Sequence, residues 1–423
     1  MKKLLLLLVA FVTVFSVMGC TETVTTTTVP QLDTSLVIFQ NKVEINATLT
    51  AYAEAWGLAN NIDVEVVTCG GDSCTYATQI LAEFQKAVQP DIFVIEGMGG
   101  YDLYADKIYP LDGETWLTDT DLEFVVDGVT YGFPVAVEGW GMAYNLEILT
   151  AAGVDPADLT NLAAYETAFA AIQAYYDTEN MDDYAVLSMA AGGTGMTWVT
   201  GLHNFNGYLS SGLAYDDSSI IDDLNAGIAN DARLAALADW VELLFEYADE
   251  TVLASGTYDT QIQLFDSGHA AFIHQGNWID PNLDEADFTM GYAPHAAFTG
   301  ENTSIFVSAP SYYVVNSASA NIATAKAFLQ DLASTTAGHE YMVNDAKMVP
   351  AFKSVTLTPS TPLSAAVAEW MASGDVYAWW QNDMPSGFGM ETIGPIYTLY
   401  ANGTLTKAQF IAQIKGAIEG LAE

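Results

Sequence analysis

The clearest indication of the fold lies in Tyr131–Asn145, which reads YGFPVAVEGWGMAYN. Asp127-Gly128, just before it, is a β-hairpin turn signal, and the valines on either side of that turn predict two short strands. Pro134 ends this pattern. Glu138 and Trp140, set among glycines, then place a carboxylate and an indole inside an apolar run. A buried carboxylate is costly without a partner, so the segment is either a functional crossover or a strand with a solvated glutamate.

The amino terminus reads as an export signal. Met1–Cys20 has two lysines, a long apolar run and small residues at its end, which is typical of a secretory leader. Residues 17–20, VMGC, resemble a bacterial lipobox, which would make Cys20 the lipidated first residue of the mature chain; an ordinary cleaved signal is the alternative. The threonine-rich residues 21–34 predict a flexible tether. We therefore expect the protein on the outer face of the cell membrane, held by lipid.

Composition limits the possible functions. The 423 residues include 53 acidic and 11 basic ones, and 51% are apolar. The length suggests two or three compact units with sizeable cores. Such an acidic surface repels nucleic acid and anionic headgroups, so neither is an expected partner. Its self-repulsion suggests a saline habitat or abundant divalent cations.

Two cysteines remain once Cys20 is set aside. Cys69 and Cys74 lie in one short loop, CGGDSC, of a chain that is expected to be exported, so a disulfide is predicted. Their spacing fits neither a zinc site nor a redox CxxC pair. The sequence predicts no metal site and no cofactor.

Three apolar runs at residues 36–39, 64–67 and 92–95 recur about every 28 residues, with helical patterns between them. This repeat predicts right-handed βαβ units and a parallel sheet, in which ligands bind beyond the carboxyl ends of the strands. Polar residues follow each run and are candidate ligand contacts, although each alone is more often a turn residue: Gln40, Asn41, Asp72 and Glu96.

Several blocks resemble the extracellular solute-binding proteins of ABC importers, in the carbohydrate cluster that includes maltose-binding protein. The first is YGFPVAVE at 131–138, followed by YN at 144–145 and AGVDP at 152–156. The second is FDSGHAAFI at 265–273 with QGNW at 275–278, and shorter matches lie at 90–93 and 322–334. The resemblance covers roughly residues 35–415.

This resemblance implies an α/β fold of two lobes, each a mostly parallel sheet flanked by helices, with hinge crossovers between them. In that family the first block crosses beneath the ligand and its glutamate contacts sugar hydroxyls, which points to Glu138. In the second block a strand leads into a tight glycine turn, and the tryptophan stacks on a sugar ring, which points to Trp278. Asn277 beside it could bind hydroxyls.

Further aromatic residues are weaker candidates. Trp140 lies in the first block, and Trp198 follows a glycine-rich loop and could equally be a core residue. Trp379 and Trp380 are adjacent, and neighbours on a helix point about 100° apart, so one is expected to face the cleft and the other to pack.

The expected lobes are 35–137 with about 293–348, and 138–292 with about 349–423. The candidate loops contain few bases, so the sequence predicts a pocket nearly free of positive charge that binds a neutral, hydroxyl-rich solute, in a monomer that delivers it to a membrane permease. A binding protein for another small polar solute, a passive surface protein and a surface glycosidase with two carboxylates are the alternatives. No GxSxG or HExxH motif favours an enzyme.

Overall fold

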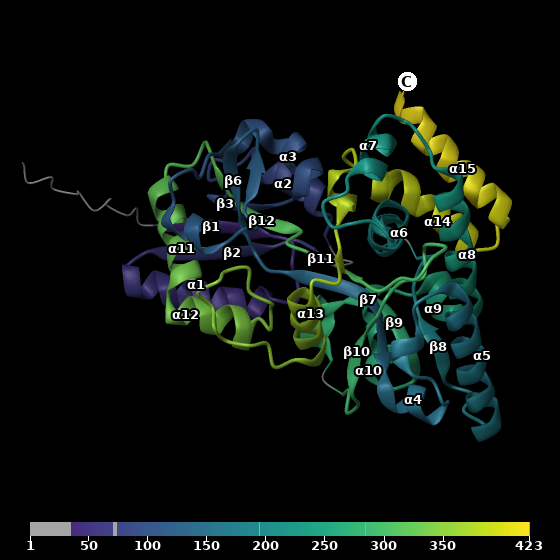
Figure 1. Ribbon diagram of the computed structural model, residues 1–423. Helices are drawn as coiled ribbons and strands as arrows, with labels where there is room; N and C mark the ends of the chain where they lie inside the picture. Colours follow the sequence, from purple (N-terminus) through teal and green to yellow (C-terminus); the bar gives the residue numbers. More distant parts are fainter. Residues whose placement is uncertain (1–34, 71–73, 194, 284, 423) are drawn as a thin grey trace, which may run out of the picture. The chain divides into compact units, whose positions relative to one another are not determined.

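A computed structural model describes residues 35–70, 74–193, 195–283 and 285–422 of the chain. These residues belong to one compact unit, Leu32–Glu423. The preceding unit, Met1–Gln31, which includes Cys20, lies outside the described residues. Two sheets with helices packed on their faces make up the described part of the chain (Figure 1).

The first sheet has the strand order β2-β1-β3-β12-β6-β5, with β4 paired to β12. β1 pairs in parallel with β2 and with β3, as the βαβ pattern predicts, whereas β12 runs antiparallel to β3. The strands are β1 (Ser35–Gln40), β2 (Asp63–Thr68), β3 (Ile92–Glu96), β4 (Ile108–Tyr109), β5 (Phe124–Val126), β6 (Val129–Pro134) and β12 (Ser311–Asn316).

Helices cover both faces of this sheet because successive strand residues point to opposite sides. Leu36 and Ile38 pack with α1 and α11, whereas Phe39 packs with α2 and α3 on the other side. The buried faces explain why these strands read as nearly continuous apolar runs. The helices of this part are α1 (Asn46–Asn60), α2 (Tyr76–Glu83), α3 (Gly97–Tyr104), α11 (Ile322–Ser334) and α12 (Thr336–Glu340).

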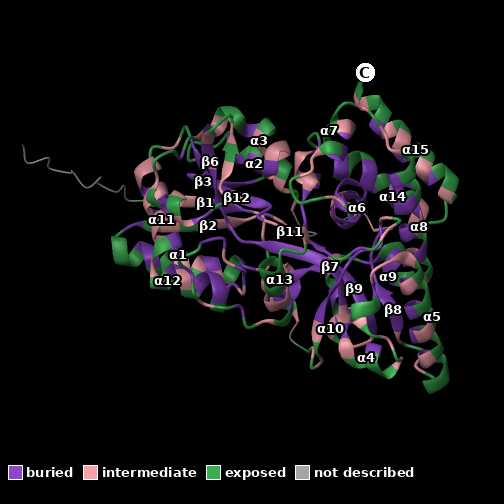
Figure 2. Cartoon of the chain, viewed as in Figure 1, coloured by how far each residue is buried: buried purple, intermediate pink, exposed green. Residues whose placement is uncertain are grey.

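The second sheet has the order β13-β11-β7-β9-β8, with β10 paired to β7. The central strand β7 runs antiparallel to β9, β10 and β11, whereas β8 pairs in parallel with β9 and β11 with β13. Both sheets are therefore mixed, which corrects the expectation of mostly parallel sheets. Figure 2 shows β7 and β9 as buried strands. The strands are β7 (Glu138–Asn145), β8 (Ala185–Ser188), β9 (Ala270–Gly276), β10 (Met290–Ala293), β11 (Ile305–Ser308) and β13 (Val376–Tyr377).

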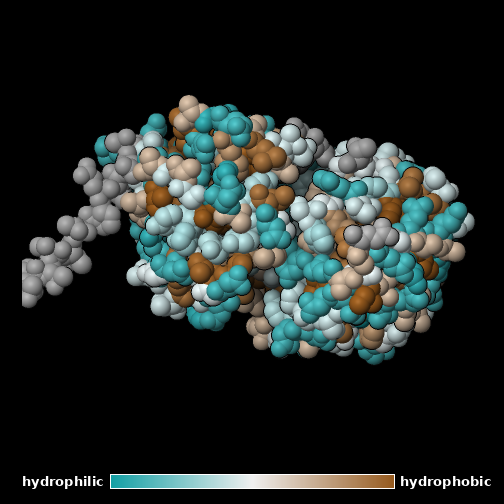
Figure 3. Space-filling model, turned by 90° about the horizontal axis from the view of Figure 1, so that it is seen from above, coloured by the Kyte–Doolittle hydropathy of each residue, from teal (hydrophilic) through white to brown (hydrophobic). Residues whose placement is uncertain are grey.

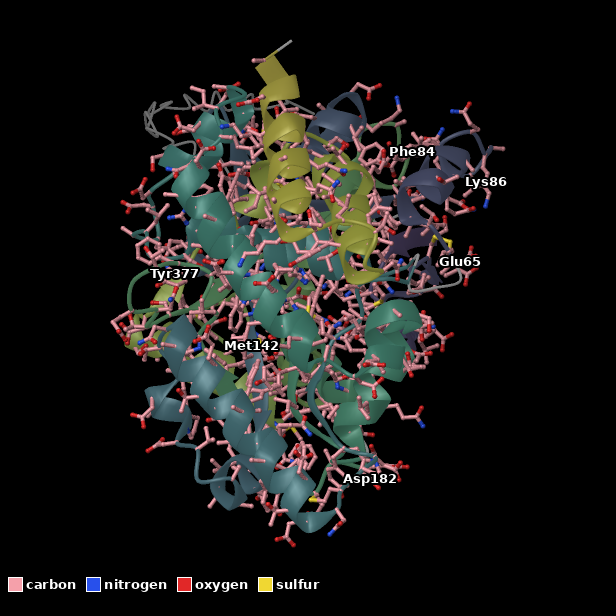
Figure 4. The ribbon with its side chains drawn as sticks, turned by 90° about the vertical axis from the view of Figure 1, so that its right-hand side faces the viewer. Glu65, Phe84, Lys86, Met142, Asp182 and Tyr377 are labelled. Atoms are coloured by element: carbon pink, nitrogen blue, oxygen red, sulfur yellow. A yellow bond between two sulfur atoms is a disulfide. The ribbon has the colours of Figure 1, made fainter. Side chains whose placement is uncertain are left out.

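Amphipathic helices bury this sheet. On α8 the residues Leu237, Trp240, Val241 and Leu244 follow helical spacing and are fully buried, and the Asn230 side chain caps the helix start. Met142 of β7 lies in the interior, while Lys86 and Asp182 lie at the periphery (Figure 4). The helices are α4 (Leu146–Ala151), α5 (Leu162–Glu179), α6 (Phe205–Ser210), α7 (Ser219–Asn225), α8 (Asp231–Tyr247), α9 (Glu250–Ser255), α10 (Tyr258–Asp266), α13 (Pro362–Ser373), α14 (Gly394–Ala401) and α15 (Lys407–Glu419).

The chain passes between the sheets at two short connections. Residues 135–137 join β6 to β7, and residues 309–310 join β11 to β12. Since β10 and β11 both pair with β7, the return to the first sheet comes after Ser308 rather than near residue 293. The Val137 N–H donates to the Val349 carbonyl (2.8 Å), which ties a later segment of the chain to the first connection.

The block at 265–273 folds differently from the expected strand and turn. Phe265 and Asp266 end helix α10, Gly268 makes the turn with φ 75°, and the strand β9 begins only at Ala270. A capping box at Thr257 starts the helix, and its apolar side chains follow helical spacing. The apolar period therefore changes from helix to strand at Gly268.

A close backbone contact joins α3 to the short 3₁₀ segment η8 (Trp380–Asp383). Gly97, at the start of α3, has φ 54°, and a Cβ atom built there would lie 2.5 Å from the Cβ of Asn382. Only a residue without a side chain allows this approach. Asn382 itself donates through Nδ2 to the Pro310 carbonyl, 3.5 Å away.

Candidate functional site

A partly open cavity lies where the connection at 135–137 meets the loop after β1. Its walls come from that loop, from the start of β7, from the 3₁₀ segment η6 (Asn277–Asn282) and from residues 346–348. Its volume of about 20 Å³ has room for about one water molecule. The lining residues are Lys42, Glu44, Ile45, Ala136, Val137, Glu138, Asn277, Trp278, Pro281, Ala346, Lys347 and Met348.

Glu138 forms an ion pair with Lys42 inside this cavity. The two side chains are only 10% and 12% exposed, and the residues are 96 positions apart in the chain. Burial opposes the charged form of Lys42, but Glu138 and Glu44 favour it, and together with Glu96 they raise the pKa of the lysine above its ordinary value. Burial also raises the pKa of Glu44, against the effect of Lys42.

This ion pair corrects the expectation of a pocket nearly free of positive charge. Lys42 and Lys347 both line the cavity, opposite two glutamates. Neither lysine stands in a motif, and a lysine just after a strand usually points to solvent. Lys42 is turned inward because it pairs with Glu138, which lies 96 positions away in the chain.

Gln40 fixes the loop that carries Lys42. Its Oε1 accepts from the Lys42 N–H (2.5 Å), and its Nε2 donates to the Lys42 carbonyl (2.9 Å) and to Thr68 Oγ1 (2.5 Å). The Thr68 hydroxyl donates in turn to Asn46 at the start of α1. Gln40 is 1% exposed and does not line the cavity, so it positions the loop.

The other predicted residues at the strand ends lie outside the cavity lining. Asn41 donates through Nδ2 to Glu96 Oε1 (2.8 Å), which links the ends of β1 and β3. Asp72 lies outside the described residues. Cys69 and Cys74 on either side of it form a disulfide with their Cα atoms 5.2 Å apart.

Trp278 and Asn277 form the wall opposite Lys42. Trp278 is partly exposed, and its indole N–H donates to Gln275 Oε1 (2.9 Å), which fixes the ring. The Asn277 amide is used within the protein: Oδ1 accepts from the Gly139 N–H and Nδ2 donates to Ser364. Trp278 is therefore the aromatic surface of the cavity, and Asn277 ties its wall to β7.

The remaining predicted tryptophans lie beside or behind Trp278. Trp140 is fully buried and stacks on Phe306 with ring centroids 4.1 Å apart, and Trp379 is 5% exposed in the same cluster. Trp380 packs on the core of the second sheet, so neither adjacent tryptophan lines this cavity. Trp198 is partly exposed and its ring lies 6.2 Å from that of Trp278. The sequence alone does not distinguish a tryptophan that packs in the core from one that lines a binding site.

Three of the five histidines lie in this aromatic layer. His203, His274 and His295 are buried around Trp140, and burial lowers the pKa of all three, that of His274 to about 4. They are therefore neutral at pH 7. Among the residues that the structure describes, no group of histidine, cysteine, aspartate and glutamate side chains is arranged to hold a metal ion.

The family model for bacterial extracellular solute-binding proteins matches residues 48–389. This chain belongs to that family. The protein is therefore an extracellular binding protein rather than an enzyme, which confirms the family indicated by the sequence blocks. No helix in the described part of this solute-binding protein is long and apolar enough to cross a membrane.

Solved structures agree on the fold. The chain is similar to a chitin oligosaccharide binding protein (TM-score 0.73, 18% identity, 92% of this chain and 99% of that one). It is also similar to RafE solved in complex with raffinose (TM-score 0.74, 14% identity, 92% of this chain and 100% of that one). A third similar structure is a sugar transporter from Bacillus licheniformis in complex with stachyose (TM-score 0.71, 16% identity, 92% of this chain and 100% of that one). These likenesses confirm the two-lobe solute-binding fold. No curated protein sequence matches this chain significantly.

Three charged lining residues of this solute-binding protein were missed by sequence reasoning: Lys42, Glu44 and Lys347. A usable signal existed for the first two. The charged run NKVE follows β1 directly, in a chain with only 11 bases. Lys347 follows no strand of the first sheet and carries no comparable signal.

Proposed function

We propose that this solute-binding protein captures an extracellular sugar or oligosaccharide between its two sheets and delivers it to the permease of an ABC importer. The observation that carries the proposal is the shared cavity of Glu138 and Trp278. An indole face packs on the C–H face of a sugar ring, and a carboxylate accepts hydrogen bonds from hydroxyls. Two proteins of similar fold were solved in complex with raffinose and with stachyose.

Binding requires that the cavity opens. Its present volume of about 20 Å³ is far below that of typical ligand pockets, which begin at about 300 Å³. We propose that the parts built on the two sheets move as lobes about the connections at 135–137 and 309–310. A ligand that contacts both lobes only when they are closed shifts the population toward the closed form.

Some of the site residues contact the sugar directly, and others hold those residues in place. Trp278 stacks on the sugar, and Glu138 accepts from its hydroxyls. Trp198 extends the aromatic surface once the cleft opens. Trp140 and Trp379 support Trp278 from behind, and Asn277 holds its wall in place.

We further propose that Met1–Cys20 is a lipoprotein signal, that Cys20 is lipidated and that residues 21–34 tether a monomer to the outer face of the membrane. The leader composition and the VMGC box support this. Labelling cells that express the full chain with a radioactive fatty acid should mark the wild type and not Cys20→Ala. Equal labelling of both would contradict the lipid anchor.

A thermal-shift screen of the purified protein tests the sugar proposal. Raffinose, stachyose, maltotriose and chitotriose are compared with amino acids, dipeptides and polyamines. A ligand at 100 times its dissociation constant stabilises by about 2.7 kcal/mol, so one sugar class should raise the melting temperature by several degrees. A shift by amino acids or peptides alone would leave a solute-binding protein whose ligand is not a sugar.

A further inference from the structure

Charge is balanced inside the cavity although it is unbalanced over the chain. The charged lining residues are two lysines, Lys42 and Lys347, and two glutamates, Glu44 and Glu138. Over the whole chain acids outnumber bases by 53 to 11. Two of the few bases therefore lie at the one cavity that Glu138 and Trp278 share.

A ligand hydroxyl that reaches Glu138 competes with Lys42, which already pairs with that carboxylate. Both side chains are nearly buried, so each needs a replacement partner when the ion pair opens. A hydroxyl group can accept from the ammonium and donate to the carboxylate, so neighbouring hydroxyls satisfy both sides at once. A ligand with a net charge would satisfy one partner and leave the other as an unpaired buried charge, which is costly.

We propose that Lys42 is a specificity-determining residue: by balancing Glu138 it makes the cavity select uncharged sugars and reject amino sugars and uronates. This inference rests on the proposed function and names the ligand class of that site more closely. Removal of the lysine charge leaves a surplus carboxylate and favours cationic sugars. Removal of the glutamate charge leaves a surplus ammonium and favours anionic sugars.

Isothermal titration at pH 7 tests this with probes of three charges: N-acetylated chitotriose and raffinose as neutral sugars, the glucosamine trimer as a cation, and trigalacturonate as an anion. The wild type should prefer the neutral probes. In Lys42→Met the affinity of the glucosamine trimer relative to the neutral probes should rise about tenfold, the value of one hydrogen bond to a charged group. In Glu138→Gln the relative affinity of trigalacturonate should rise by a similar factor.

Two control variants distinguish the effect of the Lys42–Glu138 ion pair from the effect of the net charge of the protein and of the cavity. Lys353→Met removes a charge at the surface, where Lys353 pairs with exposed Asp121, and should leave the preference unchanged. Lys347→Met removes a charge from the cavity without breaking the Lys42–Glu138 pair and should shift the preference less than Lys42→Met does. An equal shift in Lys347→Met would overturn the role of the pair.

The double variant Lys42→Met with Glu138→Gln protects the test against a folding defect. Its cavity again has equal numbers of charges of both signs, so the preference for neutral sugars should return. If sugars bind the wild type but the charge preference moves in none of the variants, this inference is wrong and the proposed function stands. If no sugar binds the wild type, the proposed function itself fails, and this inference fails with it.

Discussion

The cavity and the outer surface of this solute-binding protein differ in how their charges are arranged. The cavity is lined by two glutamates and two lysines, whereas most surface carboxylates in the described part of the chain have no basic partner. Outside the cavity, six lysines each pair with an acidic side chain: Lys86, Lys107, Lys326, Lys353, Lys407 and Lys415. Figure 3 shows hydrophilic residues spread over one face with small apolar groups between them. The charges of the cavity are thus arranged differently from those of the surface, and we expect the two regions to respond differently to salt and pH.

The largest expected effect concerns the surface. Raising NaCl from about 20 mM to 2 M should stabilise the protein by several kcal/mol, because the salt screens repulsion among unpaired carboxylates. Thermal unfolding measures this. Over the same range the affinity for a neutral sugar should change less than about twofold, since the cavity charges cancel locally. If the stability does not depend on salt, repulsion among the surface carboxylates does not destabilise the protein, and the expected difference between surface and cavity is wrong.

On the cavity side, Trp278→Ala should weaken sugar binding by about 2 kcal/mol, roughly thirtyfold, because the stacking surface is lost. Calorimetry with the best ligand of the screen measures it. Trp370→Ala is the matched control, since Trp370 packs on the core outside the cavity lining. Unchanged affinity in Trp278→Ala would remove that residue from the site.

Asp383 is an intermediate case, half-way between surface and interior. Burial, and then the nearby Asp222, raise its pKa from 3.8 to about 6. Its ionised form therefore destabilises the fold fully above pH 6, and this penalty fades as the pH falls toward 3.8. Asp383→Asn should stabilise by about 1–2 kcal/mol at pH 7 and by nothing at pH 4. The exposed Asp182→Asn serves as control in the same unfolding titration, and a gain that persists at pH 4 would refute the electrostatic cause.

The smallest effect concerns the support of the cavity. Gln40→Leu removes the side-chain hydrogen bonds that fix the Lys42 loop and should cost about 1–2 kcal/mol of stability. Sugar affinity should fall severalfold although Gln40 does not line the cavity. The control variant Gln173→Leu, on the exposed face of α5, loses one local hydrogen bond to Asp177. It should change neither the stability nor the sugar affinity. Equal behaviour of the two variants would mean that the loop needs no such support.

Sequence patterns predicted most of the fold because its elements have strong local periods. The strands predicted at 36–39, 64–67 and 92–95 are β1, β2 and β3, with α1 and α2 between them. The end of α10 was misread because the resemblance placed a strand before the turn at Gly268, whereas Phe265 and Asp266 end a helix and the strand β9 begins only at Ala270. A short block does not show by itself whether the residues before its turn are helix or strand.

The site was predicted only in part, and the reason is physical. Glu138 and Trp278 lie in blocks whose spacing is visible in one sequence, whereas the inward turn of Lys42 depends on a partner 96 positions away. Trp140 and Gln40 were misjudged because sequence shows residue type but not accessibility. A buried indole and a buried amide can serve packing or loop geometry as readily as a ligand.

The bare backbone of Gly97 lets α3 lie directly against η8, because Asn382 is already at contact distance from the place where a side chain would be. A methyl group there would push the two segments apart, and the φ of 54° would add backbone strain. In the proposed motion of the lobes, a side chain at this position would therefore disfavour every arrangement in which α3 and η8 touch and shift the population away from it.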